Sequence, residues 1–204
     1  MGAIAVSAGG AHTCALINGG TIKCWGSNSN GSLGDGSSTL VDSSVPVDVP
    51  LTGVLQISSR GSRTFALRSD GTVWGWGNGT EGLLGSTSAT SGANGLPIPV
   101  ADITNITKVT AGYSASCALR QDGTVWCWGP GTNGQVGDGA YTTRGKPVQV
   151  SGLTGAIDIA SGGNHVCALL TGGSITCWGF GGDGQLGDGL SRVRDPVGVR
   201  LVCP

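Results

Sequence analysis

The chain has 204 residues, a formal net charge of −1 and a sequence pI of about 6.0, so it lacks the excess of Lys and Arg that neutralises nucleic-acid phosphates. Its 40 Gly residues, six Trp residues and 11% charged residues are typical of short strands joined by tight turns and exclude a disordered chain, which needs high charge and few aromatics. No apolar run approaches the ~20 residues of a membrane span. We therefore expect neither a nucleic-acid partner nor membrane insertion.

A pattern of roughly 50 residues occurs four times along the chain, which we treat as a single repeat domain over residues 1–204. The repeats cover approximately residues 4–53, 54–105, 106–155 and 156–204. Each contains two β-rich segments around a turn, then Trp-Gly, a polar loop, and Gly-x-Leu-Gly or a near relative. The Trp-Gly pairs begin at Trp25, Trp76, Trp128 and Trp178. Fixed periodicity of this length is typical of propellers and solenoids, and alternation without a 3.6-residue stripe indicates strands.

The central hairpin of the first repeat lies between Cys14 and Cys24, and its midpoint is Gly19. The corresponding midpoints place three-residue loops at 18–20, 69–71, 121–123 and 171–173, each with Gly in third position. This predicts a type I turn followed by a left-handed Gly. Ile17 and Thr21 then close the hairpin, and the two cysteines become directly opposed, with Cα atoms about 4.5 Å apart. That separation is at the short end of the range for a disulfide.

Six of the seven cysteines occupy this cross-strand position, as the pairs Cys14/Cys24, Cys117/Cys127 and Cys167/Cys177. In the second repeat both partners are replaced together, by Phe65 and Gly75. We expect three disulfides within the repeats, with reduced core thiols as the alternative. Disulfides predict an oxidising location, which is extracellular, periplasmic or at the cell surface. Cys203 is left over, and three alternatives stay open: a disulfide with another chain, a disulfide with a part of the protein outside this sequence, or a free thiol.

The second repeat differs most from the other three. It carries Arg60 and Arg63 close together and a longer Ser/Thr/Gly/Ala loop over residues 86–95. We hypothesise that these residues, with the loop aromatics Tyr113 and Tyr141, form a contact surface for a protein partner. The alternative is neutral drift in surface loops.

No catalytic, cofactor or metal site is expected. His12 and His165 share one repeat position, which predicts a structural hydrogen bond for each. Asp35, Asp138 and Asp188 each precede Gly at a predicted tight turn, and single carboxylates about 50 residues apart are not the clustered oxygen ligands of calcium. Two cysteines ten residues apart do not make four zinc ligands. The chain has no Gly-x-Ser-x-Gly, His-Glu-x-x-His or P-loop motif.

The motif Cys-Ala-Leu-x-x-x-Gly-x-(Val/Ile)-x-Cys-Trp-Gly, followed by Asn-Gly-x-Leu-Gly-Asp-Gly, resembles the regulator of chromosome condensation repeat. The cysteine-containing form resembles the secreted bacterial branch often labelled alpha-tubulin-suppressor-like. The resemblance recurs four times and implies an all-β fold of β-propeller blades, each of four antiparallel strands. Members include nucleotide-exchange factors, a plant light receptor and a bacterial β-lactamase inhibitor, so the resemblance implies a rigid disc that presents loops, not one function.

Members of this family are typically seven-bladed, whereas this chain has four repeats. Three arrangements remain open: part of a larger ring, a ring or other oligomer completed by a second chain, or four blades closed on themselves. Open blade edges are templates for pairing. In each arrangement we expect the tryptophans of the Trp-Gly pairs to form the structural core between blades.

These observations predict a non-catalytic, extracytoplasmic module that binds another protein, whose identity the sequence does not give. The alternative is a structural subunit whose open blade edges join copies into a ring or a filament.

Overall fold

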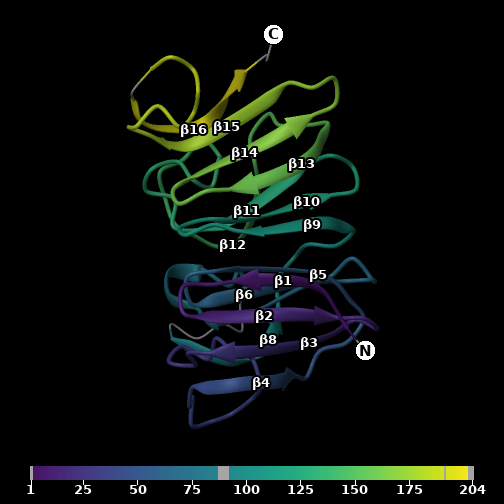
Figure 1. The fold of residues 1–204 in the computed structure, drawn as a ribbon. Helices are drawn as coiled ribbons and strands as arrows, with labels where there is room; N and C mark the ends of the chain where they lie inside the picture. Colours follow the sequence, from purple (N-terminus) through teal and green to yellow (C-terminus); the bar gives the residue numbers. More distant parts are fainter. Residues whose placement is uncertain (1, 87–91, 191, 202–204) are drawn as a thin grey trace.

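The computed structural model describes residues 2–86, 92–190 and 192–201, and they form four consecutive antiparallel sheets of four strands (Figure 1). Blade 1 contains β1 (Ala3–Ala8), β2 (His12–Ile17), β3 (Thr21–Gly26) and β4 (Ser43–Val49). Blade 2 contains β5 (Val54–Arg60), β6 (Arg63–Arg68), β7 (Val73–Asn78), the 3-10 turn η1 (Thr80–Gly82) and β8 (Ala93–Pro99). Blade 3 contains β9 (Ile106–Ala111), β10 (Ser116–Arg120), β11 (Val125–Gly129) and β12 (Arg144–Gln149). Blade 4 contains β13 (Ala156–Ser161), β14 (His165–Leu170), β15 (Ile175–Gly181) and β16 (Arg192–Leu201).

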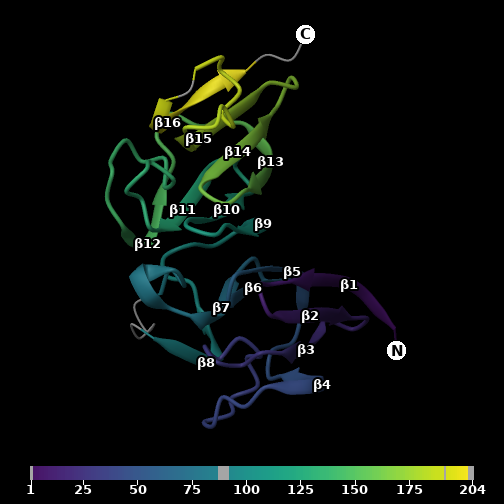
Figure 2. The same cartoon turned by 60° about the vertical axis from the view of Figure 1, so that its left-hand side comes forward.

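The blades follow one another along an arc. Each sheet pairs its strands in chain order, and the first strands of neighbouring blades, β1, β5, β9 and β13, contact one another in succession. Blades 1 and 4 lie at the two ends of the arc, with blades 2 and 3 between them (Figure 2). The all-β fold of four-stranded blades is therefore confirmed, and the blades form an open arc instead of a closed four-bladed ring.

The hairpin register follows the prediction in all four blades. Ile17 pairs with Thr21 and Cys14 with Cys24, and the same register recurs in the other blades. The third loop residue has positive φ every time, at Gly20, Gly71, Gly123 and Gly173. The type I turn is wrong for blades 1 and 4, because Gly19 and Gly172 also have positive φ, of 101° and 88°. A second Gly without Cβ allows that alternative turn, whereas Asp occupies the position in blades 2 and 3.

The three expected disulfides are present. They join Cys14 to Cys24, Cys117 to Cys127 and Cys167 to Cys177, with Cα atoms 4.1 Å apart in each pair. Cys203 lies outside the described residues. In blade 2 the Phe65 ring takes the place of the disulfide and packs edge-on against Trp128 at a centroid distance of 5.4 Å. A Cβ on Gly75 would lie 2.8 Å from the Phe65 ring, which explains why both cysteines are replaced together.

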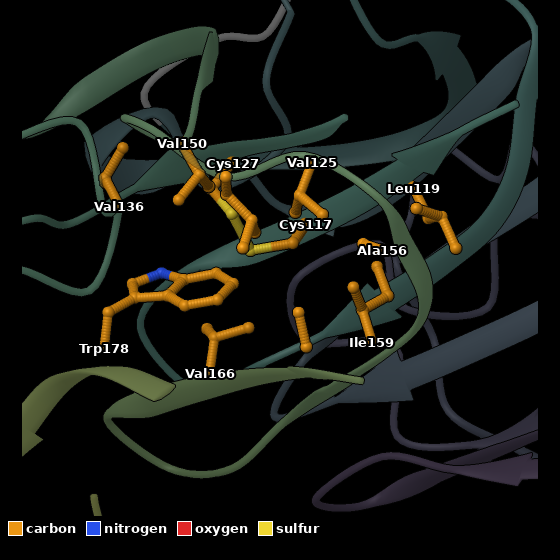
Figure 3. Packing of buried hydrophobic residues seen from close by; sticks show 12 residues of the cluster. Cys117, Leu119, Val125, Cys127, Val136, Val150, Ala156, Ile159, Val166 and Trp178 are labelled. Atoms are coloured by element: carbon orange, nitrogen blue, oxygen red, sulfur yellow. A yellow bond between two sulfur atoms is a disulfide. The ribbon is translucent and has the colours of Figure 1, made fainter. Parts of the chain in front are cut away.

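The core lies between blades. Three buried clusters each combine the disulfide or Phe65 side of one blade with the tryptophan side of the next. Figure 3 shows Trp178 and Val166 of blade 4 facing the Cys117–Cys127 disulfide and Val136 of blade 3. Burying apolar surface stabilises a fold by about 25 cal/mol per Å². Each blade gains this stabilisation only where a neighbouring blade covers it.

A repeated hydrogen bond fixes how each blade sits on the one before. The indole Nε1 of Trp76 donates to the carbonyl of Ser32 at 3.0 Å, and Trp128 and Trp178 donate to the equivalent carbonyls of Leu83 and Gln135. Gly137, which ends the loop motif of blade 3, has positive φ, and a Cβ there would lie 2.8 Å from the Trp178 ring. The loop motif and the Trp-Gly pair are thus two halves of one contact.

Replacing Cys117 and Cys127 together by Ala should lower the free energy of unfolding by about 3 kcal/mol, because it removes a cross-link that restricts the unfolded chain. Urea unfolding at neutral pH without reductant measures the change. Reductant should lower the free energy of unfolding of the wild-type chain by more than the double substitution does, since it opens all three disulfides. Equal stability of the wild-type chain with and without reductant would contradict the assignment.

Candidate functional site

A polar pocket of about 340 Å³ opens on the face that carries the turns between the first and second strands of each blade and the long loops between the third and fourth. We call it the loop-face pocket. It is lined by Gly61, Ser62, Arg63, Asn78, Glu81, Leu83, Tyr113, Ser114, Pro130, Thr132, Asn133, Gln135 and Asn164. These residues come from blades 2, 3 and 4, so the pocket exists only because the blades are packed together.

Arg63 is placed by the start of β6, at the repeat position that carries His12 in blade 1. Its side chain is only 3% exposed and crosses to blade 3. There the guanidinium Nη2 donates to the backbone carbonyls of Gly112 and Tyr113, the latter at 2.9 Å. The arginine therefore holds the turn of blade 3 while its guanidinium borders the pocket.

Arg63 is a buried cation that forms no ion pair with the residues that the structure describes. Burial lowers its pKa to about 10; the Tyr113 side chain opposes the shift and Arg60 adds to it. The group stays protonated at neutral pH. Its Nε is buried without a hydrogen-bond partner, and among the described residues no carboxylate forms an ion pair with it. Since buried charges are usually paired, this site is suited to an incoming carboxylate.

The rest of the pocket wall is fixed by hydrogen bonds. The Ser114 hydroxyl donates to the Asn164 side-chain carbonyl at 2.5 Å, which links the turns of blades 3 and 4. The Asn78 side-chain oxygen accepts from the Thr80 backbone N–H and hydroxyl. Tyr113 is 65% exposed beside this wall. A ligand would therefore meet an ordered polar surface with one aromatic ring at its edge.

The structure brings together three of the four residues predicted for partner contact. Arg60 is exposed at the end of β5 and pairs across the strands with Arg63. Tyr113 lines the loop-face pocket, whereas Tyr141 is exposed on the β11–β12 loop and is not a lining residue. Residues 87–91 of the predicted contact loop lie outside the described residues.

Sequence reasoning missed the amides of the pocket, which are Asn78, Asn133, Gln135 and Asn164. A signal was available, because a four-stranded antiparallel blade places its first turn and its last loop on the same face. Taking these segments of neighbouring repeats together would have identified the shared face. It would not have identified the pocket, whose depth depends on side-chain packing.

Among the other candidate residues, His12 and the three turn aspartates have structural roles, while the hydrogen bond expected of His165 stays a prediction. His12 is buried, and its Nε2 lies 2.8 Å from the Thr64 hydroxyl of blade 2. Asp35, Asp138 and Asp188 each accept a hydrogen bond from the backbone N–H two residues further on, as turn residues do. In the part of the chain that the structure describes, no group of three or more His, Cys, Asp or Glu residues could hold a metal ion.

Known families account for this architecture. The family model described as "Regulator of chromosome condensation (RCC1) repeat" matches residues 3–32, 54–83, 106–135 and 156–185, and a second model of the same description matches residues 70–119 and 122–169. The chain belongs to the RCC1 repeat family.

Similar proteins include the RCC1 domain-containing protein RUG3, mitochondrial, of Arabidopsis thaliana, which is 36% identical over 135 residues, or 65% of this chain and 30% of RUG3. The structure described as Kap60 bound to yeast RCC1 (Prp20) matches at a TM-score of 0.86 and 23% identity over 98% of this chain. Human WBSCR16 matches at 0.83 and 24% identity over 99% of this chain. The chain spans 49% and 53% of the lengths of these two structures.

The RCC1 repeats of this chain contain no candidate for a helical membrane anchor within the described residues. None of the helices there is both long enough and apolar enough to cross a bilayer.

Burial lowers the pKa of His12 from 6.5 to about 4, so its neutral form stabilises the fold. That contribution is complete above pH 6.5 and is lost as the pH falls toward 4, to a total of about 3 kcal/mol. In urea unfolding between pH 7 and pH 4, the wild-type chain should therefore lose more stability than a His12→Gln variant. Parallel pH dependence of the two proteins would contradict the burial of a neutral His12.

Proposed function

We propose that this RCC1-repeat chain is a non-catalytic protein-binding module that works in an extracytoplasmic compartment and accepts an acidic segment of its partner in the loop-face pocket. The observation that carries the proposal is Arg63, a buried guanidinium that borders the pocket without a carboxylate partner among the described residues. A carboxylate from the partner would supply the missing charge through charge-assisted hydrogen bonds.

The composition of the pocket favours binding over catalysis. Its lining residues are mainly amides, hydroxyls and glycines, with one arginine and one carboxylate, Glu81. They include no His, Cys or Lys that could act as nucleophile or as general base at neutral pH. Of the two histidines, His12 contacts Thr64 of blade 2 and His165 begins β14 of blade 4, and neither lines the pocket.

The pocket edge supports recognition of a protein chain. Tyr113 is largely exposed, and tyrosine and arginine are enriched among residues that dominate protein interfaces. Exposed Arg60 adds positive charge close to Arg63 on a chain of net charge −1. In the family, yeast RCC1 is described in complex with the protein Kap60, which supports a protein partner for this chain.

Three disulfides support an extracellular, periplasmic or cell-surface location, because such bonds persist in oxidising compartments and are rare in the cytosol. Self-association through the ends of the blade arc is the alternative role, and it uses residues other than those of the pocket.

Peptides selected from a random phage-displayed library on the immobilised chain should be enriched in Asp and Glu. Their affinity should fall at least tenfold in an Arg60→Gln/Tyr113→Ser variant, because removing a charged contact costs about 1.5–3 kcal/mol. Both side chains are exposed, so the variant should keep its fold.

Arg68→Gln is the matched control, since Arg68 ends β6 on the opposite side of the blade and pairs with Asp70. It should bind the selected peptides as the wild type does. Selected peptides without acidic enrichment, or equal loss of binding in the control variant, would overturn the proposal.

A further inference from the structure

The contact between neighbouring blades has two different sides, and it occurs three times. The side that a blade turns to its predecessor carries the tryptophan and is here called the Trp face. The side that it turns to its successor carries the disulfide, or Phe65, and is called the disulfide face. The described blades leave two faces uncovered, the Trp face of blade 1 and the disulfide face of blade 4.

The free Trp face of blade 1 exposes residues that the other blades bury. Val6 is 70% exposed, whereas the residues at the same repeat position, Ile57, Val109 and Ile159, are at most 8% exposed. Trp25 is half-buried, while the equivalent tryptophans of the other blades are completely buried. Both side chains have the chemistry of a blade-to-blade contact and lack the neighbouring blade.

The free disulfide face of blade 4 also exposes residues that the other blades bury. Leu169 is 36% exposed, whereas its equivalents Leu16, Leu67 and Leu119 are at most 4% exposed. Ile175 and Cys167 are also only half-buried. They border a mainly apolar hollow of about 170 Å³ on this face.

The polar groups of the two free faces match as well. At the contact of blades 1 and 2, His12 of the disulfide face meets Thr64 of the Trp face. The unmatched counterparts are His165 of blade 4 and Thr13 of blade 1, and both are half-buried where His12 and Thr64 are buried. Similarly, Trp25 holds the position of the indole donors, and Gln185 of blade 4 holds the position of the acceptor carbonyls.

We propose that a second copy of this chain docks head to tail, with the disulfide face of blade 4 against the Trp face of blade 1 of the other copy. The partner is a second copy because both halves of a contact already seen three times lie free on the same chain. In this contact Trp25 covers the Cys167–Cys177 disulfide, Val6 meets Leu169, and Thr13 meets His165.

Two such contacts close a ring. Two solved relatives superpose on 98–99% of this chain, and the chain in turn covers 49–53% of their length. Its arc is therefore about half a propeller. The second copy supplies the other half and gives eight blades in place of the seven typical of the family. Propellers of about four to eight blades are known to close.

One polar link is absent from the new contact. The hydroxyls of Ser7, Ser58 and Thr110 each accept a backbone N–H of the following blade, and Ala160 stands at this position in blade 4. The contact between copies therefore keeps the apolar cluster and the His–Thr and Trp–carbonyl links without this hydroxyl, which leaves it weaker than the contacts within the chain.

Sedimentation and light scattering test the proposal on the full chain in a Cys203→Ser background, which excludes a disulfide between copies through that cysteine. A discrete species of twice the 20.1 kDa chain mass is expected at micromolar concentration. Val6→Lys and Leu169→Glu should each weaken this dimer at least tenfold, and combining both substitutions should restore it by pairing the two charges across each contact.

Ile4→Lys is the matched control. Ile4 lies on the same strand as Val6, but its position is exposed in every blade, as Leu55 and Ile157 show. This variant should remain dimeric. A monomeric wild-type chain, a dimer unaffected by both single substitutions, or equal dissociation of the Ile4→Lys control would overturn the proposal.

Discussion

The contact of a buried tryptophan with the preceding blade is the constraint on which the rest of this structure depends. Trp178 packs against the Cys117–Cys127 disulfide and donates its indole N–H to Gln135, while Gly137 leaves room for the ring. A four-stranded sheet of this size cannot bury both of its faces alone, so each blade is stable only against a neighbour. The repeat motif therefore encodes the contact between blades as much as the blade itself.

Blade 2 shows which features of that contact are required. Phe65 and Gly75 replace the cysteine pair, and the Phe65 ring packs edge-on against Trp128 as the disulfides face the tryptophans of other contacts. The contact thus needs filled apolar volume in front of the tryptophan and tolerates a change from a covalent to a non-covalent filler. This explains how a repeat can lose its cross-link without losing its place in the arc.

A second contact between blades is made by different residues in different repeats. The first residue of the second strand reaches the following blade in both cases seen here, His12 to the Thr64 hydroxyl and Arg63 to the turn that contains Tyr113. Exchange of histidine for arginine keeps the bridge between blades and brings a buried charge to the loop-face pocket. One substitution in a repeat therefore places a cation at the wall of the pocket, which is the feature that the proposed acidic ligand would use.

The sequence predicts the blades, the hairpin register and the disulfides, because these depend on local periodicity and on pairs directly opposed across two strands. It does not predict the exposure of Trp25, whose motif is the same as that of Trp178, because burial of a repeat residue is decided by the neighbouring blade. Nor does it predict that Arg63 is buried, since an arginine in a divergent repeat equally suits a surface.

The outer faces of blades 1 and 4 differ from those of usual terminal repeats. Terminal repeats of repeat proteins usually carry a polar outer face, which keeps the array soluble. Blade 1 instead keeps Val6 and Trp25 at its free end, and blade 4 keeps Leu169. These residues follow the pattern of the interior blades and not that of a cap. The two ends have thus retained the chemistry of an interior contact, which is the feature that the proposed head-to-tail docking of a second copy uses.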